Sequence, residues 1–257
     1  MRVLCIGDVV GEIGSNFLAK KLSTFKKLKN IDVTICNGEN SSDGNGILPQ
    51  TADFLFSIGV DVITLGNHSF TRKEILPYIE DHEYIIRPAN FPKGTPGNSY
   101  CILDLGYTQL AVINLMGQEF LDIRLDNPYY VIDDVLKEIE TKNIIVDFHA
   151  EATSEKRAMA LYLDGRVSAI FGTHTHCQSG DEEIFESGTG YMTDLGMTGP
   201  VDSVLGIRKD IIIERFKTKI SSKFMYADGP CKLDGAIFDI DQKTGKTLDI
   251  ERFEIRE

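Results

Sequence analysis

The most informative run of the chain is Val167-Ser168-Ala169-Ile170-Phe171-Gly172-Thr173-His174-Thr175-His176. Its first five residues are apolar or small and rich in β-formers, which is typical of a buried strand. If the chain stays extended from Thr173 to His176, both imidazoles lie on one face at the end of that strand. Two histidines so placed can bind one metal ion or two, although two hydrogen-bonded loop histidines would give the same pattern.

Outward from this run, predicted strands and helices alternate. Strands are expected at 2–6, 31–36, 60–65, 100–105, 110–115 and 144–148, and helices near 49–58, 72–81, 129–141 and 154–163. The β-α-β-α-β order at the start favours a largely parallel, buried sheet. The end of the chain reads as an antiparallel hairpin of 232–241 and 247–255. We find no repeat and no linker, so we expect a single domain over residues 1–257.

Two local features refine the expected helices. Leu18, Leu22, Phe25 and Leu28 repeat at helical spacing, and Ser15 is a suitable N-cap for that helix. Pro77 lies inside the helix expected over 72–81, so we predict an interruption or a kink there.

Five predicted strands end in side chains that can bind a metal. In chain order these are Asp8, then Glu39 with Asn40, then Asn67 with His68, then His149, then His174 with His176. Each residue alone is weak support for a site, because the same residue types also occur as loop caps and as histidines buried in a core. Their recurrence matters, because the carboxyl ends of parallel strands meet at one crevice. Eight nitrogen and oxygen donors are too many for one zinc ion but suit two metals bridged by a carboxylate.

Composition limits the classes of partner. The 257 residues include 42% hydrophobic ones and carry a net charge of −12. That charge disfavours binding of long nucleic acid through its phosphates, but it allows a small phosphorylated substrate at a metal site. No apolar run is long enough to span a membrane, and the short apolar run at the N-terminus does not resemble a signal peptide, so we expect a cytoplasmic protein. The five cysteines include no CxxC pair, which argues against a disulfide framework or a zinc ribbon.

The order of these motifs resembles that of the calcineurin-like metallophosphoesterases, and more closely their bacterial YmdB-type branch. The resemblance runs nearly end to end and is carried by three longer motifs: Asn37-Gly38-Glu39-Asn40-Ser41, the stretch Asp147 to Lys156, and Thr193-Asp194-Leu195-Gly196-Met197-Thr198-Gly199-Pro200. The wider superfamily has Asp-x-His where this chain has Asp8-Val9-Val10, and a bridging Asp where it has Glu39. The YmdB-type branch shares both changes. The resemblance implies an α/β sandwich of two mixed sheets flanked by helices.

The resemblance also implies a ligand set for two metal ions. The first ion takes Asp8, Glu39, Asn40 and His176, with Asn40 in place of the missing histidine. The second ion takes Glu39, Asn67, His149 and His174. Iron is the implied metal and manganese an alternative, because donors without thiolate do not distinguish the two.

The implied activity is hydrolysis of a phosphodiester, with 2′,3′-cyclic nucleotides as the first substrate class and 3′,5′-cyclic nucleotides as the second. A hydroxide bridging the two ions would attack phosphorus, and His68 would protonate the leaving oxygen. A structural role for His68, holding a carboxylate, is the alternative. Two other functions remain open: a phosphomonoesterase or protein phosphatase using the same site, and a non-enzymatic regulator that binds a nucleotide. The assembly state is open too, a homo-oligomer included.

Overall fold

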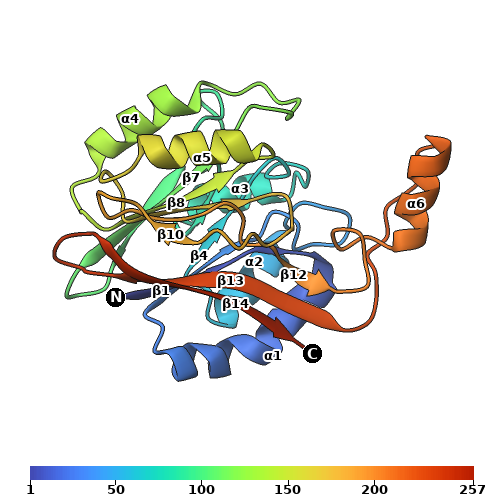
Figure 1. Ribbon diagram of the computed structural model, residues 1–257. Helices are drawn as coiled ribbons and strands as arrows, with labels where there is room; N and C mark the ends of the chain where they lie inside the picture. Colours follow the sequence, from blue (N-terminus) through green and yellow to red (C-terminus); the bar gives the residue numbers. More distant parts are fainter.

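The computed structural model describes residues 1–257, in which two β-sheets pack face to face between helices (Figure 1). The first sheet has eight strands, in the order β2 (Asp8–Val9), β12 (Met197–Pro200), β13 (Cys231–Ile240), β1 (Arg2–Ile6), β3 (Val33–Asn37), β4 (Val62–Thr64) and β5 (Ile85–Ile86), with β14 (Thr247–Arg256) paired to β13. The second has six, in the order β10 (Glu183–Ile184), β11 (Gly190–Met192), β9 (Ala169–Thr173), β8 (Ile144–His149), β7 (Gln109–Met116) and β6 (Tyr100–Asp104).

Both sheets are mixed, as expected. Strands β1, β3, β4 and β5 are parallel to one another, whereas β13 runs antiparallel to β1. In the second sheet β7, β8, β9 and β11 are parallel, and β6 pairs antiparallel with β7. The parallel strands of each sheet therefore end at a common edge, which is where the candidate ligands were expected.

The helices form the outer layers (Figure 1). They are α1 (Gly11–Lys29), α2 (Pro49–Ser57), α3 (Ile75–Asp81), α4 (Pro128–Glu138), α5 (Thr153–Tyr162) and α6 (Lys209–Thr218). Helices α1 to α3 contribute buried residues such as Leu18 and Leu55 to the core on one sheet. Helices α4 and α5 cover the other sheet with Ile132 and Met159. None of the six helices combines the length and apolar character that crossing a bilayer requires.

The inner faces of the two sheets share a third core. Val3 and Ile35 from the first sheet belong to the same buried cluster as Val112 and Phe171 from the second. Cys5 and Cys101 lie in this core, and Cys36 lies in the core between the first sheet and its helices. All three are buried free thiols.

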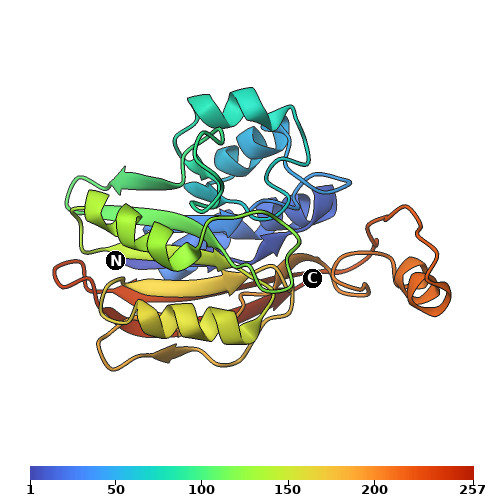
Figure 2. The ribbon, with the colours of Figure 1, turned by 90° about the horizontal axis from the view of Figure 1, so that it is seen from above.

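One segment leaves the body of the protein. Residues 201–230, here called the arm, connect β12 to β13 and include α6, of which only Ile212 is buried. Figure 2 shows α6 standing clear of both sheets, as does Figure 1. Within the arm, Ile207 forms bridges with Val204 and Tyr226. The Tyr226 hydroxyl contacts Asn45 Oδ1 at 3.1 Å, which holds the base of the arm against the body.

Two expected helix features are wrong. Helix α1 begins at Gly11, directly after β2, so Ser15 is not its cap but a buried residue whose hydroxyl donates to the Gly11 carbonyl at 3.1 Å. Helix α3 begins at Ile75, which places Pro77 in the first turn. A proline is tolerated there because its missing N–H would have had no partner inside the helix.

Candidate metal centre

The strand ends bring the expected donors together. Glu39 and Asn40 follow β3, Asn67 and His68 follow β4, and His149 is the last residue of β8. His174 and His176 follow β9, and Asp8 begins the short strand β2 that runs beside β12. Contacts between their side chains divide them into two groups that share Glu39.

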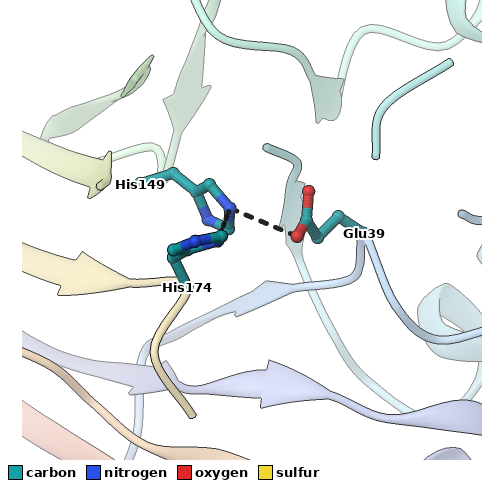
Figure 3. A group of neighbouring side chains, drawn as sticks. All are labelled: Glu39, His149 and His174. Atoms are coloured by element: carbon teal, nitrogen blue, oxygen red, sulfur yellow. Dashed lines mark hydrogen bonds and ion pairs between the residues drawn. The ribbon is translucent and has the colours of Figure 1, made fainter. Parts of the chain in front are cut away.

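The first group surrounds one atom of His149. Its Nε2 lies 2.8 Å from Asn67 Oδ1, 3.1 Å from His174 Nδ1 and 3.2 Å from Glu39 Oε1. Figure 3 shows the two imidazoles and the carboxylate turned toward this point. His174 directs its other nitrogen, Nε2, at Glu151 Oε2 over 3.0 Å, which leaves Nδ1 facing the group.

A buried relay holds a proton on Nδ1 of His149. The Thr173 hydroxyl lies 2.7 Å from Asp147 Oδ1 and 2.8 Å from His149 Nδ1. Burial raises the pKa of Asp147 to about 6, so it is mainly a carboxylate at neutral pH and accepts the Thr173 proton. The hydroxyl oxygen is then free to accept a hydrogen bond from His149 Nδ1–H. Once Nε2 loses its proton, its lone pair points at the other donors, as a metal ligand requires.

The second group lies on the other side of Glu39. Asp8 Oδ1 is 3.8 Å from His176 Nε2, and the Asn40 amide is 3.4 Å from the same nitrogen. The Asn40 amide also contacts Glu39 Oε1 at 3.1 Å. His176 donates from Nδ1 to the Leu205 carbonyl at 3.1 Å, so its Nε2 carries the lone pair. Glu39 Oε1 therefore contacts both groups.

Two observations show that this donor set fits cations. Asp8 is fully buried, yet its Oδ1 has no hydrogen-bond partner, while its Oδ2 accepts from the His174 main-chain N–H at 3.0 Å. A buried carboxylate oxygen left unpartnered is costly unless something positive faces it. In the first group, one proton on His149 Nε2 can satisfy only one of three surrounding acceptors, whereas a metal ion satisfies all of them.

The pKa shifts point the same way. Burial lowers the pKa of His149, but the facing Glu39 carboxylate raises it more, to about 9. Burial raises the pKa of Glu39, and His149 lowers it to about 2. Burial and the charge on His149 lower the pKa of His174 to about 3, so His174 is neutral. A proton on His149 thus supplies, in the metal-free chain, the positive charge that this cluster needs.

The extended conformation expected for His174 and His176 is wrong. Strand β9 ends at Thr173, and the backbone of His174 and His176 has φ of 99° and 61° instead of an extended value. Both rings nevertheless reach the site, because the turn aims them at different groups. Such backbone angles are unfavourable for residues other than glycine and persist only where surrounding contacts impose them.

A buried ion pair imposes this turn. Lys156 of α5 is 1% exposed, and its Nζ donates to Asp194 Oδ2 at 2.6 Å and to the Thr173 carbonyl at 2.9 Å. Asp194 Oδ2 also accepts from the main-chain N–H and the hydroxyl of Thr175. A methyl group at Gly172 would lie 1.9 Å from the Thr193 main-chain carbonyl oxygen and 2.8 Å from the Lys156 side chain, so only glycine fits there. The long motifs around Lys156 and Asp194 thus meet at the histidine turn.

His68 lies beside the donors without joining them. Its main-chain N–H donates to Glu39 Oε2 at 2.8 Å, and its ring is 3.4 Å from the Asn45 amide and from the Thr71 hydroxyl. The ring lines a cavity of about 210 Å³ together with Glu39, His174 and His176. The fifth histidine, His82, stacks on Tyr78 with ring centroids 3.6 Å apart, away from the site.

Sequence reasoning missed several supporting residues. Asp147 seemed to be polar strand packing, and Thr173 and Leu205 carried no signal. The sequence did mark Gly66, as the glycine before Asn67. A methyl group at Gly66 would lie 2.3 Å from His149 Nε2 and 2.5 Å from Glu39 Oε2, so a side chain there would displace the donors. Arg87, a basic residue that could otherwise contact a phosphate, donates to main-chain carbonyls of its own loop, including Pro88 and Thr95.

Known proteins resemble this chain over its whole length. A 2′,3′-cyclic-nucleotide 2′-phosphodiesterase of Bacillus subtilis (strain 168) is 45% identical over 259 residues, covering 100% of this chain and 98% of the relative. A Mycoplasma pneumoniae structure described as a novel phosphatase has a TM-score of 0.95 at 32% identity, covering 100% of this chain and 93% of that one. The NAD nucleotidase of Haemophilus influenzae shares the fold alone, with a TM-score of 0.60 at 13% identity, covering 99% of this chain and 55% of that one.

The two mixed sheets with their flanking helices are the calcineurin-like metallophosphoesterase fold, which confirms the fold class expected from the sequence. Within that class the match is narrower. The family described as YmdB-like protein matches residues 4–253, and the chain belongs to that family.

Proposed function

We propose that this protein is a metal-dependent phosphodiesterase that hydrolyses small phosphodiesters, with 2′,3′-cyclic nucleotides as the first substrate class and 3′,5′-cyclic nucleotides as the second. The observation that carries the proposal is the meeting of seven buried or half-buried donors in two groups that share Glu39 Oε1. The name of the 45% identical relative supports the choice of substrate.

The two groups suggest how two ions would be held. Asp8, Asn40 and His176 would hold one ion, and Asn67, His149 and His174 the other, with Glu39 between them. Asn40 presents its amide nitrogen to His176, and rotation of the terminal amide would present the oxygen instead. The absence of thiolate among the donors suits iron or manganese.

When bound, such a pair of ions activates water as a nucleophile and neutralises charge on the phosphoryl oxygens. The chain's own residues hold the geometry for that chemistry. Glu151 and the Leu205 carbonyl orient His174 and His176, and the Asp147–Thr173 relay keeps His149 in the tautomer whose Nε2 carries a lone pair. Because these partners fix ring directions, they matter nearly as much as the ligands.

We assign His68 the role of the acid that protonates the leaving oxygen. Its ring borders the same cavity as the donors, and its hydrogen-bonding neighbours are the Asn45 amide and the Thr71 hydroxyl. Imidazole can carry a transferable proton near neutral pH, which suits departure of an alkoxide. The backbone contact to Glu39 holds the residue in place, so its ring remains available.

The decisive experiment is hydrolysis of 2′,3′-cyclic AMP by protein loaded with Fe²⁺ or Mn²⁺, with an EDTA-stripped sample as control. We expect turnover only in the loaded protein, and the product isomer identifies the bond that breaks. Absence of turnover with two metals bound would overturn the substrate assignment.

A phosphomonoesterase is the second candidate, because the Mycoplasma pneumoniae structure is described as a phosphatase. The comparison that separates the two is the kcat/KM for bis(p-nitrophenyl) phosphate against that for p-nitrophenyl phosphate under identical metal loading. We expect the diester to be preferred, and the reverse preference would favour the monoesterase.

A further inference from the structure

The cavity at the metal centre has two chemically different walls. One wall consists of donors, including Glu39, His174 and His176, with His68 beside them. The other wall comes from the arm and is apolar or aromatic: Leu205, Ile207, Phe224 and Tyr226. The donors have a role in the proposed reaction, but the aromatic wall has none so far.

A larger cavity begins at the same aromatic residues. It has a volume of about 1010 Å³, lies between α1 and the arm, and is lined by Phe17, Phe224 and Tyr226 among others. The smaller cavity, about 210 Å³, is below the usual size of a ligand site, whereas the two together are ample. A ligand with its phosphoryl group at the donors and too large for the smaller cavity would extend past Phe224 and Tyr226, which line both cavities.

The two aromatic rings differ in how they are held. Tyr226 is part of the framework: its hydroxyl contacts Asn45 Oδ1 at 3.1 Å, and its ring packs so close to Gly11 that a methyl group there would lie 2.9 Å away. Phe224 is 38% exposed and has the Arg215 guanidinium 4.9 Å from its ring centroid. Phe224 is thus the ring with surface to offer a ligand.

Two other aromatic residues, Tyr129 and Phe91, pack against rings elsewhere in the fold. Tyr129 packs edge-on against Tyr162, with ring centroids 5.1 Å apart, and Phe91 packs in the same way against Phe70 at 5.3 Å. Neither lines the cavity at the donors.

We propose that the arm is the nucleobase-binding element of the site, with Phe224 as the ring on which the base stacks. The inference rests on the proposed phosphodiesterase function and adds to it that the substrate is a nucleotide recognised on both its phosphate and its base. Stacking on one aromatic ring fits purines and pyrimidines alike, so we expect a tolerant base preference. The arm also carries the Leu205 carbonyl that orients His176, so the element that binds the base also shapes the donor group.

The test compares two substrates that share the reacting group. One is 2′,3′-cyclic AMP, and the other is the 2′,3′-cyclic phosphate of methyl riboside, which has no base. In Phe224→Ala we expect the KM for cyclic AMP to rise roughly fivefold to a hundredfold, with unchanged kinetics for the substrate without a base. Phe224→Trp should retain the wild-type KM. Phe216→Ala is the matched control, because Phe216 is exposed on the same arm but lines neither cavity.

The outcomes separate the two proposals. Equal effects of Phe224→Ala on both substrates, or no effect on either, would overturn the base-binding role. If the wild-type protein hydrolyses neither substrate, the phosphodiesterase proposal fails. The base-binding role of Phe224 is then tested by measuring nucleotide binding. Adenosine 3′-monophosphate should then bind the wild-type, metal-loaded protein more tightly than Phe224→Ala, while inorganic phosphate binds both alike; equal nucleotide affinities would overturn it.

Discussion

Glu39 is the residue whose contacts reach furthest across the site. Its Oε1 faces both donor groups, and its Oε2 accepts from the main chain of His68. It is fully buried, and its pKa stays low because His149 offsets the effect of burial, so the carboxylate charge is present across the physiological range. A carboxylate that faces both donor groups is the arrangement that a pair of cations needs.

We expect Glu39→Gln to lower kcat/KM by roughly 10²–10³-fold or more and to weaken metal retention, because the amide removes that shared charge. The measurements are turnover of 2′,3′-cyclic AMP and metal content after dialysis. Glu140→Gln, a change of the same chemistry at an exposed position, is the control. Full activity in Glu39→Gln would contradict the dinuclear assignment.

Replacing His68 should have different effects from replacing Glu39, because His68 lies outside both donor groups. We expect His68→Ala to keep both metals and to lose turnover by roughly 10²–10⁴-fold, the range typical of general acid catalysis. The loss should be smallest for bis(p-nitrophenyl) phosphate, whose leaving group needs no proton. Metal content and the two rates are measured on the same preparation, and loss of a metal would instead make His68 a ligand.

At the scale of elements, the turn after β9 shows how a local pattern can mislead. The sequence places two histidines after a buried strand, and strand periodicity alone predicts that they share a face. The turn is set instead by Lys156, 18 residues before His174, and by Asp194, 20 residues after it. No rule of local spacing contains that ion pair, although the long motifs around both residues marked them as unusual.

Removing one partner of a buried ion pair is destabilising by about 3–5 kcal/mol, and here it also frees the histidine turn. We therefore expect Lys156→Met to weaken metal binding at least about tenfold, a typical cost of losing support around a ligand. Titration of metal into stripped protein measures it, and circular dichroism shows whether the chain stays folded. Arg157→Met, at a half-buried position of the same helix where the guanidinium pairs with Glu183, should bind metal normally. Wild-type affinity in folded Lys156→Met would show that the pair does not position the histidines.

The sequence predicted most of the sheet and the positions of the donors, since both follow from strand patterns and from the meeting of parallel strand ends. It did not predict the arm as part of the site. Leu205 and Phe224 lie far along the chain from every donor and belong to no periodic pattern. They reach the cavity because the arm contacts the body there: the Leu205 carbonyl accepts from His176 Nδ1, and the Tyr226 hydroxyl contacts Asn45 Oδ1.

At the scale of the whole molecule, the two sheets are joined by the core between them. Because Val3 and Phe171 belong to the same buried cluster, neither sheet can expose its inner face without the other. We propose on this ground that residues 1–257 form one domain. Calorimetry of the metal-free protein should show one transition whose van't Hoff and calorimetric enthalpies agree. Two resolved transitions would divide the chain into separate units.

The donors join the two sheets a second time, since Glu39 and Asn67 follow strands of the first sheet and His149 and His174 lie on or after strands of the second. Metal ions bound there hold the sheets together only in the folded state, so they must raise its stability. With free metal at 1,000 times Kd the gain is about 4 kcal/mol, which corresponds to a rise in Tm of about 8–16 °C for a chain of this size.

Thermal denaturation of EDTA-stripped and Mn²⁺-loaded protein measures the shift, and Glu39→Gln should show a smaller one at the same metal concentration. The size of the shift in Tm distinguishes the sites, because metal bound to exposed acidic groups would bind the unfolded chain as well and stabilise little. An unchanged Tm with two ions bound would mean that the ions do not occupy the buried groups between the sheets.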